Sequence, residues 1–131
     1  MKNSLIIMKL LLTFILMLSS CNNRTIQEDF EGKWFLCKIE NNGVVTIQNV
    51  CPEIEFAKDG KGKITKPSKE EIGFTYSMSS ESKKIIFSFD VDHQYFEGKE
   101  YFYKIYTKDN LEILELSSKD GTSKYTLSKE K

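Results

Sequence analysis

Apolar and polar residues alternate with a period of two along most of the chain from residue 33 onward. The alternation is clearest in Ile72–Met78 and Ile85–Val91, where Ile, Phe, Tyr, Met or Val occupies every second position. Because successive side chains of a strand point to opposite faces, this period predicts strands with one buried face. A helical period does not extend beyond a turn or two, so the pattern predicts an all-β domain.

Turn dipeptides separate the apolar runs at close intervals. Asn42-Gly43, Asp59-Gly60 and Asp120-Gly121 are strong hairpin signals, and Asp109-Asn110 is a weaker one, because tight primed turns need positive φ. Two of the short early strands are expected to be halves of one bent strand. The pattern predicts strands near residues 33–40, 44–50, 53–57, 62–66, 72–78, 83–91, 100–107, 111–117 and 122–128.

Short links between consecutive strands are typical of a meander. Closing a meander into a barrel removes the exposed edges that would otherwise pair with other chains. We therefore predict an antiparallel up-and-down barrel of eight strands, with a two-sheet sandwich as the alternative. The longest connection after strand-like sequence, Asp92–Glu100, is expected to lie at the barrel mouth.

A different pattern occupies residues 1–20. Lys2 and Lys9 precede an apolar run from Leu10 to Leu18 that only Thr13 interrupts. A positive segment followed by a short apolar one is typical of a secretory signal. A spanning helix needs about 20 apolar residues to cross ~30 Å of hydrocarbon. We interpret residues 1–20 as a cleaved signal peptide, and the alternative is an uncleaved membrane helix.

The signal segment ends in Leu18-Ser19-Ser20-Cys21, which resembles the lipobox of bacterial lipoproteins. The resemblance implies that Cys21 is lipidated, that the chain is cut before it, and that the new amino end is acylated too. Two or more acyl chains anchor a protein stably to a membrane. Asn22 stands where enteric inner-membrane lipoproteins carry aspartate, so we expect the outer membrane of the cell envelope. The alternative is a chance cysteine after an ordinary signal.

The charge composition of the mature chain limits the kinds of partner that are expected. The 131-residue precursor has 19 Lys and Arg against 19 Asp and Glu. Removal of Lys2 and Lys9 with the signal leaves 17 basic against 19 acidic residues, a formal charge of −2. Neither a basic patch for nucleic acid nor an acidic tail is present, so nucleic acid is not an expected partner.

The cysteine count predicts a disulfide. With Cys21 assigned to lipid, two cysteines remain, Cys37 and Cys51. An even remainder in an oxidising envelope compartment favours a bridge between them, and closing a loop of about 15 residues contributes ~3 kcal/mol in the chain-entropy model. The alternative is two separate thiols. Two cysteines and one distant histidine have no recognisable metal-ligand spacing, so no metal or cofactor is expected.

The mature chain divides into a tether and a barrel domain. Residues 21–31 are polar except for Ile26 and Phe30, whose spacing of four predicts one helical turn that packs two apolar residues onto the domain. The barrel domain is predicted over residues 32–131, and no Pro/Gly-rich linker splits it.

The stretch Glu31–Glu40 carries the residues of a family resemblance. Gly32, Lys33 and Trp34 resemble the Gly-x-Trp motif of lipocalins and of small lipocalin-like lipoproteins of the Bacteroidota. The resemblance implies that Gly32 lets the chain turn into the barrel base and that Trp34 plugs this end. Lipocalins place an arginine of the last strand over the tryptophan, whereas the chain here ends with Lys124, Lys129 and Lys131.

Candidate catalytic residues are few. His93 is the single histidine, between Asp92 and Gln94, and the alternation places its acidic neighbours on the solvent side. Glu53 and Glu55 share a strand face that should also be the outer one. The sequence contains no phosphate loop, metal motif or nucleophile elbow, so an enzyme is not expected.

Binding is the remaining class of function. An eight-stranded barrel is just wide enough to be filled by side chains or to hold one small ligand. A ligand pocket would be lined by inward aromatic residues of the predicted strands: Phe74, Tyr76, Phe87, Phe89 and Tyr125. Rings on both faces of Tyr101–Tyr106 would leave at least two outside, where they could contact a partner.

We therefore expect a membrane-anchored, non-enzymatic interaction module. The alternatives are a carrier of a small hydrophobic ligand and an inhibitor of an envelope enzyme.

Overall fold

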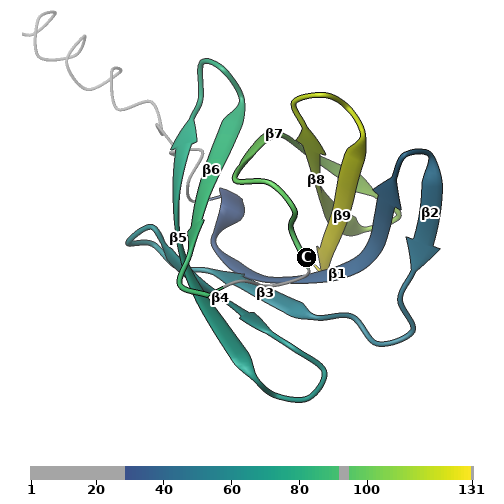
Figure 1. The fold of residues 1–131 in the computed structure, drawn as a ribbon, viewed down its shortest axis with the longest axis horizontal. Coiled ribbons are helices and arrows are strands. Elements are labelled where there is room, and N and C mark those ends of the chain that lie inside the picture. Colours follow the sequence, from purple (N-terminus) through teal and green to yellow (C-terminus); the bar gives the residue numbers. More distant parts are fainter. Residues whose placement is uncertain (1–28, 92–94, 131) are drawn as a thin grey trace, which may run out of the picture.

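The computed structural model describes residues 29–91 and 95–130, and these form one antiparallel sheet (Figure 1). The predicted signal segment, Cys21, Ile26 and His93 lie outside the described residues. Strands that are consecutive along the chain pair with each other, except that β3 pairs with β1 and not with β2. Their bounds are β1 (Gly32–Asn41), β2 (Val44–Ile47), β3 (Glu53–Phe56), β4 (Lys61–Thr65), β5 (Glu71–Ser79), β6 (Lys84–Phe89), β7 (Glu100–Lys108), β8 (Leu111–Ser118) and β9 (Ser123–Glu130).

The sheet closes because its first strand pairs with its last. The strand order is β2-β1-β3-β4-β5-β6-β7-β8-β9, and β1 also pairs with β9. Eight strands, β1 and β3 to β9, thus form a closed up-and-down barrel, and β2 lies outside the ring. The predicted all-β, eight-stranded lipocalin-like barrel is confirmed, and the two-sheet sandwich is not formed.

The first strand has two partners on one edge. Its first half, Gly32–Phe35, pairs with β3, and its second half, Lys38–Asn41, pairs with β2. The opposite edge pairs with β9. β2 and β3 are therefore two halves of one interrupted strand, as the sequence pattern predicted, and residues 48–52 make the interruption.

A β-bulge at Cys37 accompanies this interruption. Opposite β9, Leu36 pairs with Leu127 and Lys38 pairs with Thr126, so Cys37 is the extra residue. An extra residue shifts the phase of the alternation and bends the strand. Leu36 is fully buried before the bulge, whereas after it Ile39 packs against the core. Alternation after Leu36 already places Cys37 on the outer side, and the bulge keeps Lys38 outside and brings Ile39 inward.

Two of the predicted turns have the primed backbone, whereas at Asp59-Gly60 and Asp120-Gly121 only Gly60 (φ 75°) and Gly121 (φ 74°) have positive φ. Asn42 (φ 50°) and Gly43 (φ 79°) are both left-handed, as are Asp109 (φ 51°) and Asn110 (φ 63°). Two consecutive positive φ values define the primed turn whose twist matches two antiparallel strands. The weaker Asp109-Asn110 signal therefore marks the same type of turn as the stronger one.

Candidate functional site

The five residues predicted to line a ligand pocket are brought together as a packed aromatic cluster. Phe74, Tyr76, Phe87 and Tyr125 are at most 7% exposed, and Phe89 packs against them half-buried. The Phe74 and Phe87 ring centroids lie 5.5 Å apart, as do those of Phe87 and Phe89. These are contact distances between rings. The residues thus fill the space that a ligand would need.

Two further aromatic residues, Tyr95 and Phe96, close one end of this cluster. Both belong to the long connection before β7 and are only 8% and 4% exposed. The Phe96 ring lies 5.4 Å from the Phe87 centroid and 4.9 Å from that of Tyr125. The sequence pattern predicts this connection at the barrel mouth but does not predict that it plugs the end of the barrel. The available signal was a pair of adjacent aromatic residues in an otherwise polar loop.

A missing side chain in β4 makes room for the rings. Gly62 lies opposite both Phe56 and Phe74 in the sheet register. A Cβ atom at Gly62 would collide with the Phe74 ring and lie 2.6 Å from the Glu55 carbonyl oxygen. The interior at this level is therefore filled by large rings packed over a glycine.

Buried tyrosine hydroxyls have partners within the chain. Tyr76 donates to the Ala57 carbonyl at 2.6 Å, and the Tyr101 hydroxyl accepts from the Gly98 N–H at 2.7 Å. The Tyr125 hydroxyl accepts from the Glu97 N–H at 3.4 Å. Burial is the main cause that raises the pKa of Tyr101 above its ordinary value. These hydroxyls stabilise loops at the barrel rim and do not form a polar pocket inside it.

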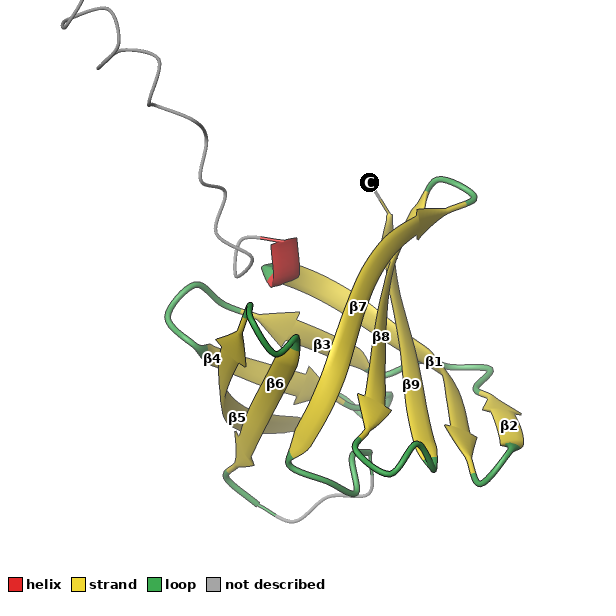
Figure 2. Ribbon diagram, turned by 90° about the horizontal axis from the view of Figure 1, so that it is seen from above, coloured by secondary structure: helices red, strands yellow, loops and turns green. Residues whose placement is uncertain are grey.

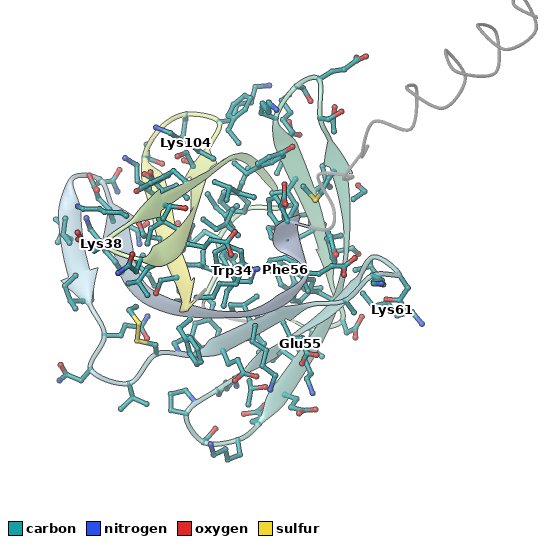
Figure 3. All side chains as sticks on the ribbon, turned by 180° about the vertical axis from the view of Figure 1, so that it is seen from behind. Trp34, Lys38, Glu55, Phe56, Lys61 and Lys104 are labelled. Carbon is teal, nitrogen blue, oxygen red and sulfur yellow. A yellow bond between two sulfur atoms is a disulfide. The ribbon has the colours of Figure 1, made fainter. Side chains whose placement is uncertain are left out.

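The opposite end of the barrel is closed by Trp34 and Phe30, both fully buried. Asp29 and Phe30 are helical, so the described part of the predicted turn is present (Figure 2). The Trp34 indole donates to the Phe30 carbonyl at 2.9 Å. Phe30 meets Tyr103 edge-on at 5.0 Å between centroids. Figure 3 shows Trp34 and Phe56 inside the ring of strands.

A lysine of the last strand covers the tryptophan. Lys129 Nζ lies 4.5 Å from the Trp34 ring centroid and donates to the Glu31 carbonyl at 3.1 Å. Its ion pair with Glu112 spans 3.5 Å. A cation over an indole face is attracted by the negative face of the ring. Among the three C-terminal lysines noted in the sequence, Lys129 thus takes the place that the lipocalin resemblance gives to an arginine.

The predicted disulfide is present. Cys37 and Cys51 are bonded, with their Cα atoms 4.8 Å apart. Hydrogen bonds flank the bridge on both sides, from Leu36 N to the Pro52 carbonyl at 3.0 Å and from Gln48 N to the Cys37 carbonyl at 2.8 Å. The disulfide therefore joins the bulge of β1 to the interruption between β2 and β3.

The outer face of β3 to β5 carries ion pairs. Glu53 pairs with Lys33 at 3.1 Å, and Lys63 pairs with Glu55 at 3.7 Å and with Glu71 at 3.3 Å. Glu53 and Glu55 thus lie on the outer face that the alternation predicted. Across residues 29–91 and 95–130, no group of three or more His, Cys, Asp and Glu side chains is arranged to hold a metal ion.

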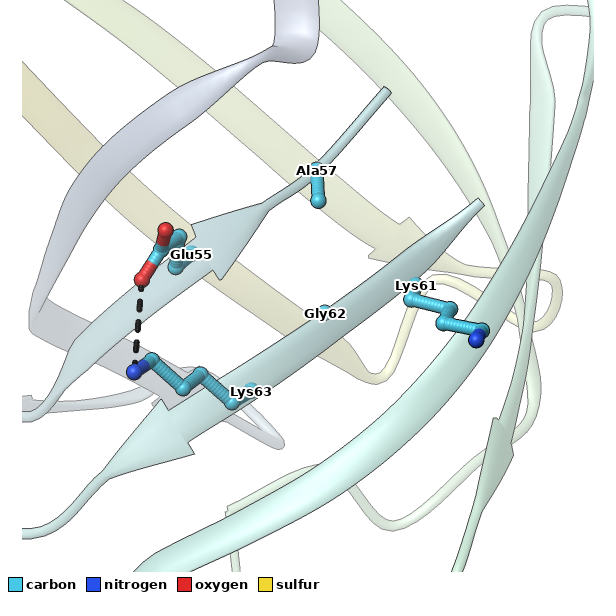
Figure 4. Close-up of a pocket in the computed structure, with 5 residues that line it drawn as sticks. All are labelled: Glu55, Ala57, Lys61, Gly62 and Lys63. Atoms are coloured by element: carbon cyan, nitrogen blue, oxygen red, sulfur yellow. Dashed lines mark ion pairs between the residues drawn. The ribbon is translucent and has the colours of Figure 1, made fainter. Parts of the chain in front are cut away.

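Hollows occur on the surface of the barrel. One of about 200 Å³ lies beside the Glu55–Lys63 ion pair, over Ala57 and Gly62 (Figure 4). Another, of about 330 Å³, is lined by Tyr103 and Ile105 with Lys83, Lys104 and Asp29 around them. Small-molecule sites usually measure about 300–1,000 Å³. The first hollow is below this range and the second is at its lower end.

The outward rings of β7 are covered by lysines. Tyr101 and Tyr103 point inward, whereas Phe102 is 39% exposed and Tyr106 is half-buried. Lys84 Nζ lies 5.3 Å from the Phe102 centroid, and Lys104 Nζ lies 5.3 Å from that of Tyr106. Two rings do face out, as the sequence predicted, and each has the ammonium group of one lysine over its face.

The three most exposed large apolar residues among those that the structure describes lie instead on and beside β2: Val44, Ile47 and Val50. Val44 is 67% exposed, Val45 49%, Ile47 64% and Val50 64%. All four residues of β2 are exposed, so neither of its faces packs on the core. The sequence pattern predicts a strand over residues 44–50 and does not predict that it lies outside the ring. No sequence signal separates β2 from the ring, because adjacent apolar residues also occur in ring strands, as at Ile85-Ile86 and Ile113-Leu114.

Comparisons with known proteins give one structural likeness. Neither a family model nor a curated protein matches the chain. An uncharacterized protein from Bacteroides eggerthii has a similar crystal structure, with a TM-score of 0.51 and 18% sequence identity. The match covers 77% of this chain and 99% of that one. At this identity the likeness shows the fold alone.

No helix within the described part of the chain is long and apolar enough to cross a membrane.

Proposed function

We propose that this chain is a lipid-anchored lipoprotein of the bacterial cell envelope whose barrel is a non-enzymatic interaction module. The packed interior carries the proposal. Phe74, Phe87 and Tyr125 fill the ring, and Phe96 plugs one end while Trp34 plugs the other. A protein whose barrel is filled by its own side chains binds through its outer surface, where the β2 residues are exposed.

The filled interior favours the module over the carrier. A ligand inside the ring would have to displace Phe96 and at least one of the rings that it stacks on, because their centroids are 5.4 to 6.0 Å apart. Removing a buried ring costs about 3–5 kcal/mol of stability. A carrier would therefore use a surface hollow such as the one over Tyr103 and Ile105.

The anchoring part of the proposal rests on the sequence. Leu18-Ser19-Ser20-Cys21 supplies the lipobox pattern, and the absence of aspartate after Cys21 favours the outer membrane. The barrel begins at Gly32, so residues 21–31 would connect lipid to domain. An interaction module held in this way meets partners at the membrane surface, and an envelope enzyme that it inhibits is one such partner.

Two measurements test the proposal. Full-length protein should incorporate labelled palmitate and Cys21→Ser protein should not; equal incorporation by the two would contradict lipid anchoring at Cys21. The domain Asn22–Lys131, expressed into a periplasm, should show a bare mass in native mass spectrometry. A reproducible extra mass that leaves on unfolding would instead establish a carrier and would identify its ligand.

A further inference from the structure

The outer edge of β2 is an uncovered strand edge. β2 pairs only with β1 among the described strands, and the chain turns away at Gln48 before another strand can cover it. An unpaired edge presents backbone N–H and C=O groups that form hydrogen bonds with any added strand. Figure 2 shows β2 at the far end of β1 from the helical turn. Its edge is therefore accessible to another chain.

The composition around β2 lacks the usual protection of an edge. Residues 41–52 contain no Asp, Glu, Lys or Arg, although these make up 29% of the chain. Proteins normally guard an exposed edge with charges, especially lysine, or with proline or a bulge within the strand. β2 itself is Val-Val-Thr-Ile, a run of residues that favour strands. Its chemistry therefore suits an uncharged, extended partner strand.

The edge is also held in place before any partner arrives. β1 supports β2 on one side and is itself supported by β9 through pairs from Ile39 to Asn41. The primed turn at Asn42-Gly43 fixes one end of β2, and the Cys37–Cys51 bridge fixes the segment that leaves its other end. A strand ordered in advance loses little conformational freedom on binding.

We propose that β2 pairs antiparallel with β2 of a second copy, so that the two barrels form a symmetric dimer. The inference rests on the proposed function and names the partner of the interaction module. A two-fold axis through an antiparallel pair places one residue opposite its own copy, and a charged residue there would meet a like charge. No residue from Val44 to Ile47 is charged. Whichever residue of β2 lies opposite its own copy, no like charges therefore meet across the pair.

The symmetry also agrees with a common membrane anchor. A two-fold axis keeps equivalent points of the two copies at equal height along the axis. The two Asp29 ends, where the tethers enter, therefore lie at one level and can face one membrane.

The test is the assembly state of the mature chain with Cys21→Ser, measured by native mass spectrometry and sedimentation velocity over a wide concentration range. We expect a monomer–dimer equilibrium. Val45→Lys should raise the dimer dissociation constant about tenfold or more, because the substitution enters the interface twice. Ile86→Lys is the matched control, since Ile86 on β6 is also 49% exposed but lies away from the edge, and it should leave dimerisation unchanged.

A second variant is detected by the gain of a disulfide crosslink, so a folding defect cannot imitate the expected result. Val45→Cys should give a disulfide-linked dimer under mild oxidation, whereas Ile86→Cys should give no disulfide-linked dimer. A monomer at all concentrations with no crosslink would overturn the inference, as would equal effects at residues 45 and 86. In native mass spectrometry, a monomer without added mass would refute the proposed dimer only. A monomer that carries a small added mass would refute the proposed interaction module as well. Pairing of β2 with a different protein in place of its own copy would also overturn the inference.

Discussion

The barrel interior and the β2 hairpin are both rich in apolar residues, but the interior buries them and the hairpin exposes them. Inside, rings from β5, β6 and β9 and from one loop bury almost all of their surface against one another. On β2, valine and isoleucine have no core to pack on and stay about half to two-thirds exposed. The contrast shows that apolar content alone does not reveal where this chain has its core and where it has a contact surface.

The largest expected effect comes from removing a ring at the closed end. Trp34→Ala should lower the free energy of unfolding by about 3–5 kcal/mol, because Trp34 is fully buried and contacts Lys129. Val44→Ala, at a residue 67% exposed, should change it by less than ~0.5 kcal/mol. Urea unfolding of both variants checks the pair. Similar losses would show that β2 belongs to the core.

The disulfide joins β1 to the segment between β2 and β3, and its removal should have the next largest effect on stability. Replacing both Cys37 and Cys51 by serine should reduce stability by ~3 kcal/mol, since the bridge closes a loop of about 15 residues. Urea unfolding with and without reductant measures this loss. The reductant should affect only the parent, and an effect on the double variant would point to another cause.

Gly62 tests how tightly the interior is filled. Gly62→Ala should cost about 1–3 kcal/mol, because the new methyl group meets the Phe74 ring and the Glu55 carbonyl oxygen. Lys61→Ala, at an exposed residue of the same strand, is the control and should change stability by less than ~0.5 kcal/mol. An unchanged Gly62→Ala variant would indicate free volume beside the rings and would favour the carrier.

Lys129 tests the lid over the tryptophan. Lys129→Met keeps the apolar stem but removes the ammonium group, and should cost about 1 kcal/mol. Lys129→Arg should retain most of the stability, because a guanidinium can lie on the same indole face. Unfolding measurements that ranked Lys129→Arg as low as Lys129→Met would contradict the cation–ring contact.

Asp120 gives the smallest effect. Its carboxylate accepts hydrogen bonds from Ser118 Oγ at 2.7 Å and from the Thr122 N–H at 3.0 Å. The Thr122 N–H contributes most to lowering the pKa of Asp120 to about 2. The contribution to stability is thus present above the ordinary aspartate pKa of about 4 and is lost as the pH falls toward 2. Asp120→Asn should flatten this part of the stability profile in acid unfolding.

The sequence predicted most of the ring but less of its surface. Alternation located the buried strands because one face of each is covered, and the Asn-Gly and Asp-Gly turns set their ends. The Cys37–Cys51 bridge followed from counting. Phe96 could not be assigned to the interior, because a loop has no period. The exposure of β2 depends on where β1 changes partners, which is a property of the register and not of Val44–Ile47 alone.

The pairing of β1 with β9 has a consequence for how the protein is made. This contact joins the first strand of the domain to Ser123–Glu130, the last. Ring closure therefore waits until the whole chain is available, and contacts between distant segments form slowly. A chain that emerges from the ribosome with its amino end first stays open until its final residues arrive. Truncation after residue 122 should accordingly leave an open sheet that is prone to aggregate and susceptible to proteolysis.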